Sequence, residues 1–523
     1  MDFGPSYAKT ESIRPLAENG QASQSGSLET LFNTLADFTF TLPPFSCIIA
    51  LVIKIEQRKI YLYFIYPFAT LFFIALSFCF IMSARGYLVV FDNGIKFEKT
   101  GMIIGSTNPP GAKIFLNGKD ISKATIPFLS TKINNLKKGK YILDYEKDGF
   151  YTWQKELLVS PERVTWANYA LLFSKNPKIE KTKIGGKLLG SLNSKDNKYS
   201  IFLVQNADNQ IIYLVNNSDD SKDDVFETAK MKPEERISGV TLIAWSDDHK
   251  NLLVKGMLGA VEQYYVINTS DKTSENVTGL LPAGFSSPMF NPANGDELYF
   301  ALNGQVLRVN VPAKTSQAFS EKGILYFSVE KNGNIYYIKD NAGARSLWQA
   351  NGDFSNPSAI TDGIPASESY SLTVSSQGQK MALQTKEGAL YLIDNIDGKE
   401  MLIVMGKNIS EFSWSPDGDR LLYKNGPDVK VFEFVDYKKE SREYQIPNGA
   451  DLRDFAWYDN DHLLAETLNN KAEVMDFDGQ NKIDLAAITP GSKVFFSSDN
   501  HNISFISKSD ADKFALSRYI TEF

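Results

Sequence analysis

The hydrophobic pattern of the sequence first singles out one long apolar run. Residues 60–83, from Ile60 to Ser83, contain 24 residues without a charged side chain. As an α-helix this run would be about 36 Å long, enough to cross the roughly 30 Å hydrocarbon core of a bilayer. A buried core helix or a cleaved signal peptide fits a run of this length less well. The pattern therefore predicts one transmembrane helix, through which the chain contacts a lipid bilayer.

The charges that flank this run predict its orientation. Lys54, Arg58 and Lys59 precede it, whereas Arg85 is the only nearby basic residue that follows. The positive-inside rule then places the N-terminus in the cytoplasm. The chain is thus expected to be a single-pass protein of the cytoplasmic membrane with its C-terminal domains outside.

Residues 1–59 would form a cytoplasmic tail. Their start is rich in Ser, Gly, Gln, Asn and Glu, which is typical of disorder. Residues 42–53 are apolar but too short to span a bilayer, so an interfacial or re-entrant segment is one interpretation. An over-extended translation start is the other interpretation of the tail.

After a juxtamembrane linker at residues 84–100, the pattern changes to short alternating strands with turn residues between them. Pro110 and Gly111 suit the centre of a type II turn, and the Asn117–Gly118 pair is a strong hairpin signal. Residues 101–174 are therefore predicted to form a small antiparallel β-sandwich.

This order of turn, strand and hairpin resembles the PEGA domain. Pro110 stands where the family motif has Glu. The residues that match the family motif are Pro109, Gly111, Ala112, Asn117 and Gly118. The resemblance implies a small extracytoplasmic β-module of prokaryotic envelope proteins, without catalytic activity and without a known ligand. The glycines and prolines are expected to serve backbone geometry.

From about residue 185 onward, the chain repeats a unit of strand, turn and strand. The clearest copy spans residues 409–434, where Ser-Pro-Asp-Gly-Asp separates two apolar strands. The spacing of 37–54 residues between copies, with four short strands in each, is typical of β-propeller blades. The first strands of the eight copies are anchored on Ser191, Trp245, Phe290, Phe327, Val374, Trp414, Trp457 and Phe496.

These repeats predict a β-propeller over residues 178–523 with seven or eight blades, of which eight is favoured. The last copy shows three strands, and a strand near residues 178–185 would complete it and close the ring. The turns resemble those of TolB-like and WD-like propellers, which implies architecture and leaves function open. The predicted fold class is an all-β ectodomain, a PEGA-like sandwich and a propeller, behind one transmembrane helix.

Composition excludes several classes of function. Lys and Arg total 55 against 62 Asp and Glu, a net charge of −7, so we expect no nucleic-acid partner. Three histidines and two cysteines exclude a Cys/His-rich metal site and a disulfide framework. Both cysteines, Cys47 and Cys79, lie in apolar runs, so the exported part cannot rely on disulfides.

The motifs of known catalytic sites are absent. The sequence has no H-E-x-x-H, G-x-S-x-G or P-loop pattern. His249, His462 and His501 fall in corresponding turns and are expected to be solvated. The Asp-rich turns at residues 417–419 and 476–479 are expected to be Asx turns and not calcium sites. We therefore predict no catalytic residue, no metal site and no cofactor.

The two tryptophans of the small domain admit two interpretations. Trp153 and Trp166 could stack on sugars, but core packing is favoured for both.

The sequence as a whole favours a non-enzymatic scaffold of the cell envelope. Its PEGA-like and propeller domains would bind an envelope protein or a cell-wall glycan. The alternative is an enzyme in the propeller channel, a lyase or glycoside hydrolase acting on envelope polysaccharide. The first strands, which line such a channel, are mostly apolar or Ser/Thr, and this favours binding over catalysis.

Overall fold

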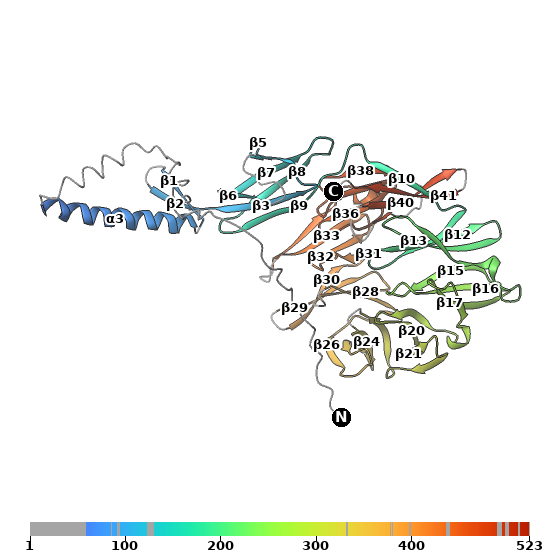
Figure 1. Cartoon of the computed structure of the whole chain (residues 1–523). Coiled ribbons are helices and arrows are strands. Elements are labelled where there is room, and N and C mark those ends of the chain that lie inside the picture. Colours follow the sequence, from blue (N-terminus) through green and yellow to red (C-terminus); the bar gives the residue numbers. More distant parts are fainter. Residues whose placement is uncertain are drawn as a thin grey trace, which may run out of the picture. The chain divides into compact units, whose positions relative to one another are not determined.

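A computed structural model of the chain (Figure 1) divides into two compact units, residues 1–85 and residues 86–523. It describes residues 59–84, 86–91, 95–122, 130–330, 333–376, 378, 380–396, 399–435, 440–488, 494–496, 502–510 and 513–521. Lys54, Arg58, Cys47, His501 and the apolar segment at residues 42–53 lie outside the described residues.

The first unit contains the helix α3 (Lys59–Ala84), which covers the long apolar run. Residues 65–83 of this helix are long and apolar enough to cross a membrane. Large apolar side chains along it are exposed, among them Phe68 and Phe80. A helix that is apolar on all sides and unburied is typical of a membrane span or a signal sequence.

The second unit begins with a hairpin of β1 (Tyr87–Phe91) and β2 (Ile95–Lys99), followed by a sandwich of two sheets. One sheet has the order β6-β3-β9, from β6 (Thr131–Leu136), β3 (Gly101–Asn108) and β9 (Val164–Leu171). The other has the order β5-β4-β7-β8, from β5 (Lys119–Asp120), β4 (Lys113–Leu116), β7 (Gly139–Glu146) and β8 (Trp153–Val159). Alternate positions point inward, so Ile103, Leu143, Tyr145 and Val159 are buried between the sheets.

The sandwich differs from the predicted one in the direction of a single strand. All its other strand pairs are antiparallel, but β9 runs parallel to β3, with Met102 beside Val164 and Ile104 beside Trp166. The prediction of a purely antiparallel sandwich was therefore wrong. A hairpin pattern identifies only pairs that are adjacent in sequence, and β3 and β9 are separated by five strands.

Eight four-stranded sheets follow among the described residues, and they form the propeller blades (Figure 1). Blades 1–4 consist of β11 (Lys187–Asn193), β12 (Tyr199–Asn206), β13 (Asn209–Asn216), β14 (Lys222–Glu227); β15 (Ser238–Trp245), β16 (Asn251–Leu258), β17 (Val261–Asn268), β18 (Ser274–Asn276); β19 (Ser286–Asn291), β20 (Asn294–Leu302), β21 (Gln305–Asn310), β22 (Thr315–Ala318); β23 (Ile324–Val329), β24 (Ile335–Asn341), β25 (Ala344–Ala350), β26 (Ser358–Asp362). Blades 5–8 consist of β27 (Tyr370–Val374), β28 (Lys380–Thr385), β29 (Leu390–Ile396), β30 (Lys399–Gly406); β31 (Ile409–Trp414), β32 (Arg420–Asn425), β33 (Asp428–Val435), β34 (Glu440–Gln445); β35 (Leu452–Trp457), β36 (His462–Thr467), β37 (Lys471–Asp476), β38 (Ile483–Ala487); β39 (Val494–Phe496), β40 (Asn502–Asp510), β41 (Lys513–Ile520), β10 (Lys178–Lys183).

The ring closes as the sequence predicts, because blade 8 takes its outer strand from the start of the array. Strand β10 pairs antiparallel with β41, with Thr182 opposite Leu516. Hydrophobic clusters then link each blade to the next around the whole ring, and the last joins Ile506 and Leu516 of blade 8 to Phe202 of blade 1. Each of the eight sequence anchors lies in the first strand of its blade, so the repeat assignment is confirmed.

Candidate functional site

A buried polar cluster joins the sandwich to blades 6 and 7 of the propeller. Its centre is Lys155 on β8, whose side chain is 5% exposed. The Lys155 Nζ atom lies 2.8 Å from Oδ2 of Asp476, the last residue of β37, and 3.0 Å from Oδ2 of Asp478 on the following turn. A buried lysine persists only where anionic partners compensate its lost hydration. The two aspartates provide that compensation from the other domain.

The Asp476 carboxylate receives further donors from both domains. Trp153 Nε1 donates to Oδ1 over 3.2 Å, and Asn481 Nδ2 donates to Oδ2 over 3.0 Å. The backbone N–H of Gln154 in turn donates to Asn481 Oδ1 over 2.9 Å. The carboxylate of Asp476 thus accepts hydrogen bonds from Lys155, Trp153 and Asn481, which use most of its acceptor capacity and hold it in place.

Aromatic rings surround these charges. Lys155 Nζ lies 4.9 Å from the ring centroid of Tyr169 on β9 and 5.1 Å from that of Phe477. Arg420 on β32 of blade 6 also contacts Phe477, with its Cζ atom 4.0 Å from the centroid. Cation–π contacts of this kind strengthen when the cation is desolvated. Phe477 thus links a cation of the sandwich with a cation of blade 6.

Arg420 connects the cluster to the turn before β36. Its Nε atom donates to Glu433 Oε1 over 3.0 Å, and its Nη1 atom donates to Asp461 Oδ1 over 3.0 Å. Tyr444 Oη donates to the second oxygen of Glu433 over 2.9 Å. The guanidinium therefore ties together the turn before β36 and two strands of blade 6.

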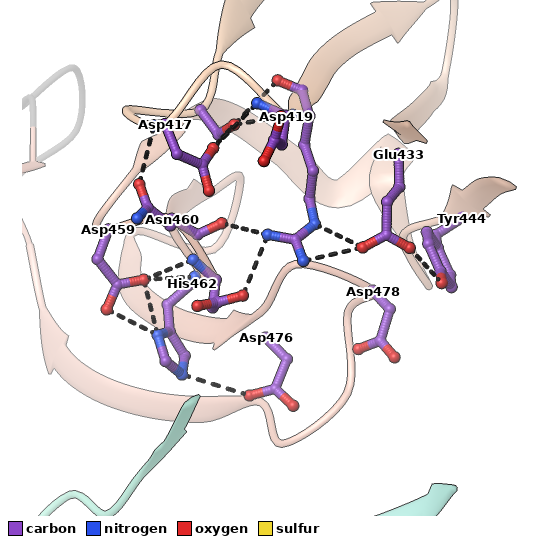
Figure 2. A network of polar contacts seen from close by, with 12 residues as sticks. Asp417, Asp419, Glu433, Tyr444, Asp459, Asn460, His462, Asp476 and Asp478 are labelled. Carbon is purple, nitrogen blue, oxygen red and sulfur yellow. Dashed lines mark hydrogen bonds and ion pairs between the residues drawn. The ribbon is translucent and has the colours of Figure 1, made fainter. Parts of the chain in front are cut away.

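His462, at the start of β36, lies between two carboxylates in the same cluster (Figure 2). Its Nδ1 atom lies 2.8 Å from Asp459 Oδ1, and its Nε2 atom lies 3.7 Å from Asp476 Oδ1. Burial opposes the charged imidazole, but the charge of Asp459 and its hydrogen bond outweigh burial and raise the pKa of His462. The neighbouring carboxylates therefore favour the charged form of the imidazole.

The same competition governs Lys155. Burial alone would lower the pKa of Lys155, but the charge of Asp476, with that of Asp478, raises it above its ordinary value. Lys155 and His462 both pair with carboxylates, and Lys155 also contacts Tyr169. The arrangement holds the sandwich and the propeller together.

A second feature is a cavity of about 350 Å³ at the first strands of blades 5, 6 and 7. Its walls carry hydroxyl and amide groups, two phenylalanines and one carboxylate, that of Glu411. The lining residues are Ser371, Thr373, Gln384, Ser410, Glu411, Phe412, Ser413 and Phe455. This surface can hydrogen-bond a polar ligand and stack on its apolar faces.

The motif residues of the sandwich all lie in the connections between strands. Asn117 and Gly118, with φ of 49° and 75°, form the two-residue loop between Leu116 and Lys119. Asn117 also accepts the backbone N–H of Ile142 over 2.8 Å. Gly111 has φ of 87°, Pro109 precedes it, and Ala112 packs against the core of the sandwich. The contacts described for these residues set the backbone geometry of the two turns.

Two expectations about single residues were wrong, namely a solvated side chain for His462 and core packing for Trp166. His462 is 4% exposed and paired with Asp459, because its turn is covered by the sandwich. His249 is half-buried, 3.1 Å from Asp196. Trp153 is buried as predicted, but Trp166 is 57% exposed, because it alternates with the inward-facing Ala167 on β9.

Sequence reasoning missed Lys155, although β8 contains a signal that could have found it. Trp153, Lys155, Leu157 and Val159 all occupy the inward positions of one alternating strand. A lysine in such a series predicts a buried anionic partner. The turn at 476–479 is an Asx turn as predicted, since Asp478 Oδ1 accepts the N–H of Gln480, and the same aspartates also bind Lys155. Within the described ranges, no group of three or more His, Cys, Asp or Glu side chains is arranged to hold a metal ion.

Comparison with known proteins assigns the sandwich and describes the propeller. Residues 100–173 match the PEGA domain family. No curated protein sequence matches the chain. The propeller is similar to an oligogalacturonate lyase in complex with manganese, at 12% identity and a TM-score of 0.38, covering 64% of this chain and 99% of the lyase.

Two other solved structures are also similar to part of the chain. The C-terminal WD40 domain of Sif2 is 13% identical with a TM-score of 0.42, covering 65% of this chain and 98% of that domain. TolB from Acinetobacter baumannii is 15% identical with a TM-score of 0.29, covering 50% of this chain and 64% of TolB. At these identities the likenesses assign neither a ligand nor a reaction. The chain is thus a PEGA domain followed by an eight-bladed propeller and preceded by an apolar helix.

Proposed function

We propose that this chain is a non-enzymatic scaffold protein of the cell envelope. Helix α3 anchors it in the cytoplasmic membrane with the N-terminus in the cytoplasm, and the PEGA domain and propeller lie outside. The propeller binds another envelope protein or a cell-wall glycan. The apolar helix supports the anchor, and the flanking charges Lys54, Arg58 and Lys59 support the orientation.

One observation carries the scaffold proposal, the buried contact of Lys155 with Asp476 and Asp478. A flexible tether between two domains needs no buried charge pairing across their contact. Buried ion pairs that are fully hydrogen-bonded fix one geometry, because partial separation leaves a desolvated charge without a partner. The contact thus favours two domains that present their surfaces as one rigid body.

The cavity at blades 5–7 is the proposed binding site of the propeller. Its hydroxyl and amide groups suit the hydroxyls of a glycan or the backbone of a peptide, and Phe412 and Phe455 offer apolar contacts. Among its lining residues Glu411 is the only carboxylic acid, whereas glycoside hydrolysis commonly uses a pair. This composition supports binding over hydrolysis.

The test is binding of envelope components to the full chain in lipid nanodiscs. Purified cell-wall glycan and a detergent extract of envelope proteins serve as the two ligand preparations. Filling the cavity with Ser410→Trp should reduce binding at least tenfold. Ser316→Trp, on the exposed outer strand β22, is the matched control and should bind as the wild type does. Equal binding by both variants would exclude the cavity as the binding site.

The channel enzyme remains the alternative, and the observation that favours it is the Glu411 carboxylate beside three serine hydroxyls. Prolonged incubation of the full chain with envelope polysaccharide distinguishes the two. The scaffold proposal predicts no shortened or unsaturated products. Product formation that Glu411→Gln abolishes would replace the scaffold by an enzyme.

A further inference from the structure

The PEGA domain exposes large apolar side chains at one end. Val164 and Trp166 on β9 are 39% and 57% exposed, and Leu158 on β8 is 59% exposed. In the register of the sheet, Val164 lies beside Met102 and Trp166 lies beside Ile104. An apolar stripe on the outer face of the β6-β3-β9 sheet is thus formed by Met102, Ile104, Val164 and Trp166, whereas Leu158 belongs to the other sheet.

This end of the domain is where the chain arrives from helix α3. The helix ends at Ala84, and two residues later the Gly86 carbonyl accepts the N–H of Thr100 over 2.9 Å. The Thr100 carbonyl accepts the N–H of Glu162, and the Arg163 carbonyl accepts the N–H of Met102. Gly86 is therefore attached directly to the strand ends that carry Met102 and Val164.

Lysines surround the same end. Strand β6 runs antiparallel to β3, so Leu136 lies opposite Gly101 and the turn at Lys137 and Lys138 is at this end too. Lys99, Lys137 and Lys140 form exposed ion pairs with glutamates at 2.7–3.0 Å. Lys138 and Lys132 are exposed, and in the described part of the chain no ion pair involves them.

The net charges of the two domains have opposite signs. Residues 100–173 contain 10 basic and 6 acidic side chains, a net charge of +4. Residues 174–523 contain 37 basic and 48 acidic side chains, a net charge of −11. An anionic surface would attract the PEGA domain and repel the propeller.

We propose that the end of the PEGA domain formed by Met102, Val164, Trp166, Lys132 and Lys138 docks on the anionic headgroups of the bilayer. This inference rests on the membrane anchor proposed above. Trp166 would lie at the headgroup level, where its amphipathic ring is favoured, and the lysines would face lipid phosphates. Docking would hold the PEGA domain at a fixed distance from the membrane.

The tryptophan positions allow a direct test. The chain has six tryptophans, and helix α3 contains none of them. Trp153 and Trp457 are buried, and Trp245, Trp348 and Trp414 are half-buried in the propeller, so Trp166 is the most exposed. The full chain is reconstituted in nanodiscs whose lipids are brominated near the top of the acyl chains. Quenching of tryptophan fluorescence by bromine then reports contact of a tryptophan with lipid.

The proposal predicts quenching in nanodiscs of anionic lipid, and Trp166→Phe removes at least half of it. Trp348→Phe is the matched control and leaves the quenching unchanged. Lys132→Gln with Lys138→Gln reduces the quenching at least twofold, whereas Lys181→Gln with Lys183→Gln on the propeller strand β10 does not.

Three results would overturn the docking. They are an unquenched wild type, a Trp166→Phe variant quenched as strongly as the wild type, and lysine variants without effect. Co-flotation of the chain with vesicles measures the anchor separately. A chain that floats without quenching retains its anchor and lacks the docking, which would leave the stripe to a protein partner. A chain that does not float refutes both proposals.

Discussion

Lys155 of the PEGA domain lies 2.8 Å from Asp476 of the propeller, across 321 residues of sequence. Both side chains are almost completely buried. The contact joins the PEGA domain to a propeller of eight blades. The contact fixes the orientation of the propeller relative to the PEGA domain, and this is the basis of the scaffold proposal.

Removal of the Lys155 charge should destabilise the chain strongly. Lys155→Met leaves Asp476 and Asp478 buried without their cation, and breaking a buried pair in this way costs about 3–5 kcal/mol. Urea unfolding of the full chain in nanodiscs measures the loss. Lys140→Met removes an exposed partner of Glu156 and should cost less than about 1 kcal/mol. A loss for Lys155→Met as small as that of the control would show that the contact contributes little.

The stability of this contact should fall as the pH rises. The pKa of folded His462 is raised by Asp459, so the folded state holds a proton that the unfolded state releases near pH 6.5. The stabilisation is complete below that pH and is lost as the pH rises through the folded pKa. His462→Gln should remove this dependence. The test measures the unfolding free energy of the wild type and of His462→Gln between pH 5 and pH 9, about the range of histidine titration. Two parallel curves would contradict the prediction.

Closure of the ring should depend on Arg518 in β41. Its Nη2 atom lies 2.9 Å from Glu180 of the closing strand β10, and its Nε atom lies 3.3 Å from Asp220 of blade 1. Burial raises the pKa of Asp220 even beside this guanidinium. Arg518→Met should therefore cost about 3 kcal/mol or more, because a buried acid loses its cation.

Hydrogen exchange locates the effect of Arg518→Met. Faster exchange is expected in β10 and β41, which are the strands that close the ring. Arg236→Met, which changes an exposed arginine, serves as the control and should alter stability by no more than about 0.5 kcal/mol. Exchange that accelerates equally in all blades would argue against a local role in closure.

The propeller could be predicted from sequence because its signals are local and repeated. Each blade carries an apolar first strand before a polar turn, and the three strands of the last copy, β39 to β41, required a fourth from outside. The Asn117–Gly118 loop was predictable for the same reason, since left-handed backbone conformations restrict the choice of residue. The closing strand β10 followed from the need to satisfy an open sheet edge.

The polar cluster could not be predicted, because it arises from contact between two domains. The pattern of turns assigns His462 and Asp476 to blade 7 but does not show that the sandwich covers them. The parallel pairing of β3 with β9 was missed because no turn joins these strands. Trp166 was assigned to the core by residue type, whereas the register of β9 places it outside.

The central claim is that the PEGA domain and the propeller form one rigid body, and a distance measurement between them tests it most directly. Spin labels are placed at Lys113→Cys on β4 and Val404→Cys on β30, both exposed, after Cys47 and Cys79 are changed to Ser. Pulsed electron paramagnetic resonance of the full chain in nanodiscs should give one narrow distance distribution. The added Lys155→Met substitution should broaden it. A broad distribution in the chain that keeps Lys155 would contradict the account, because the two domains would then move independently.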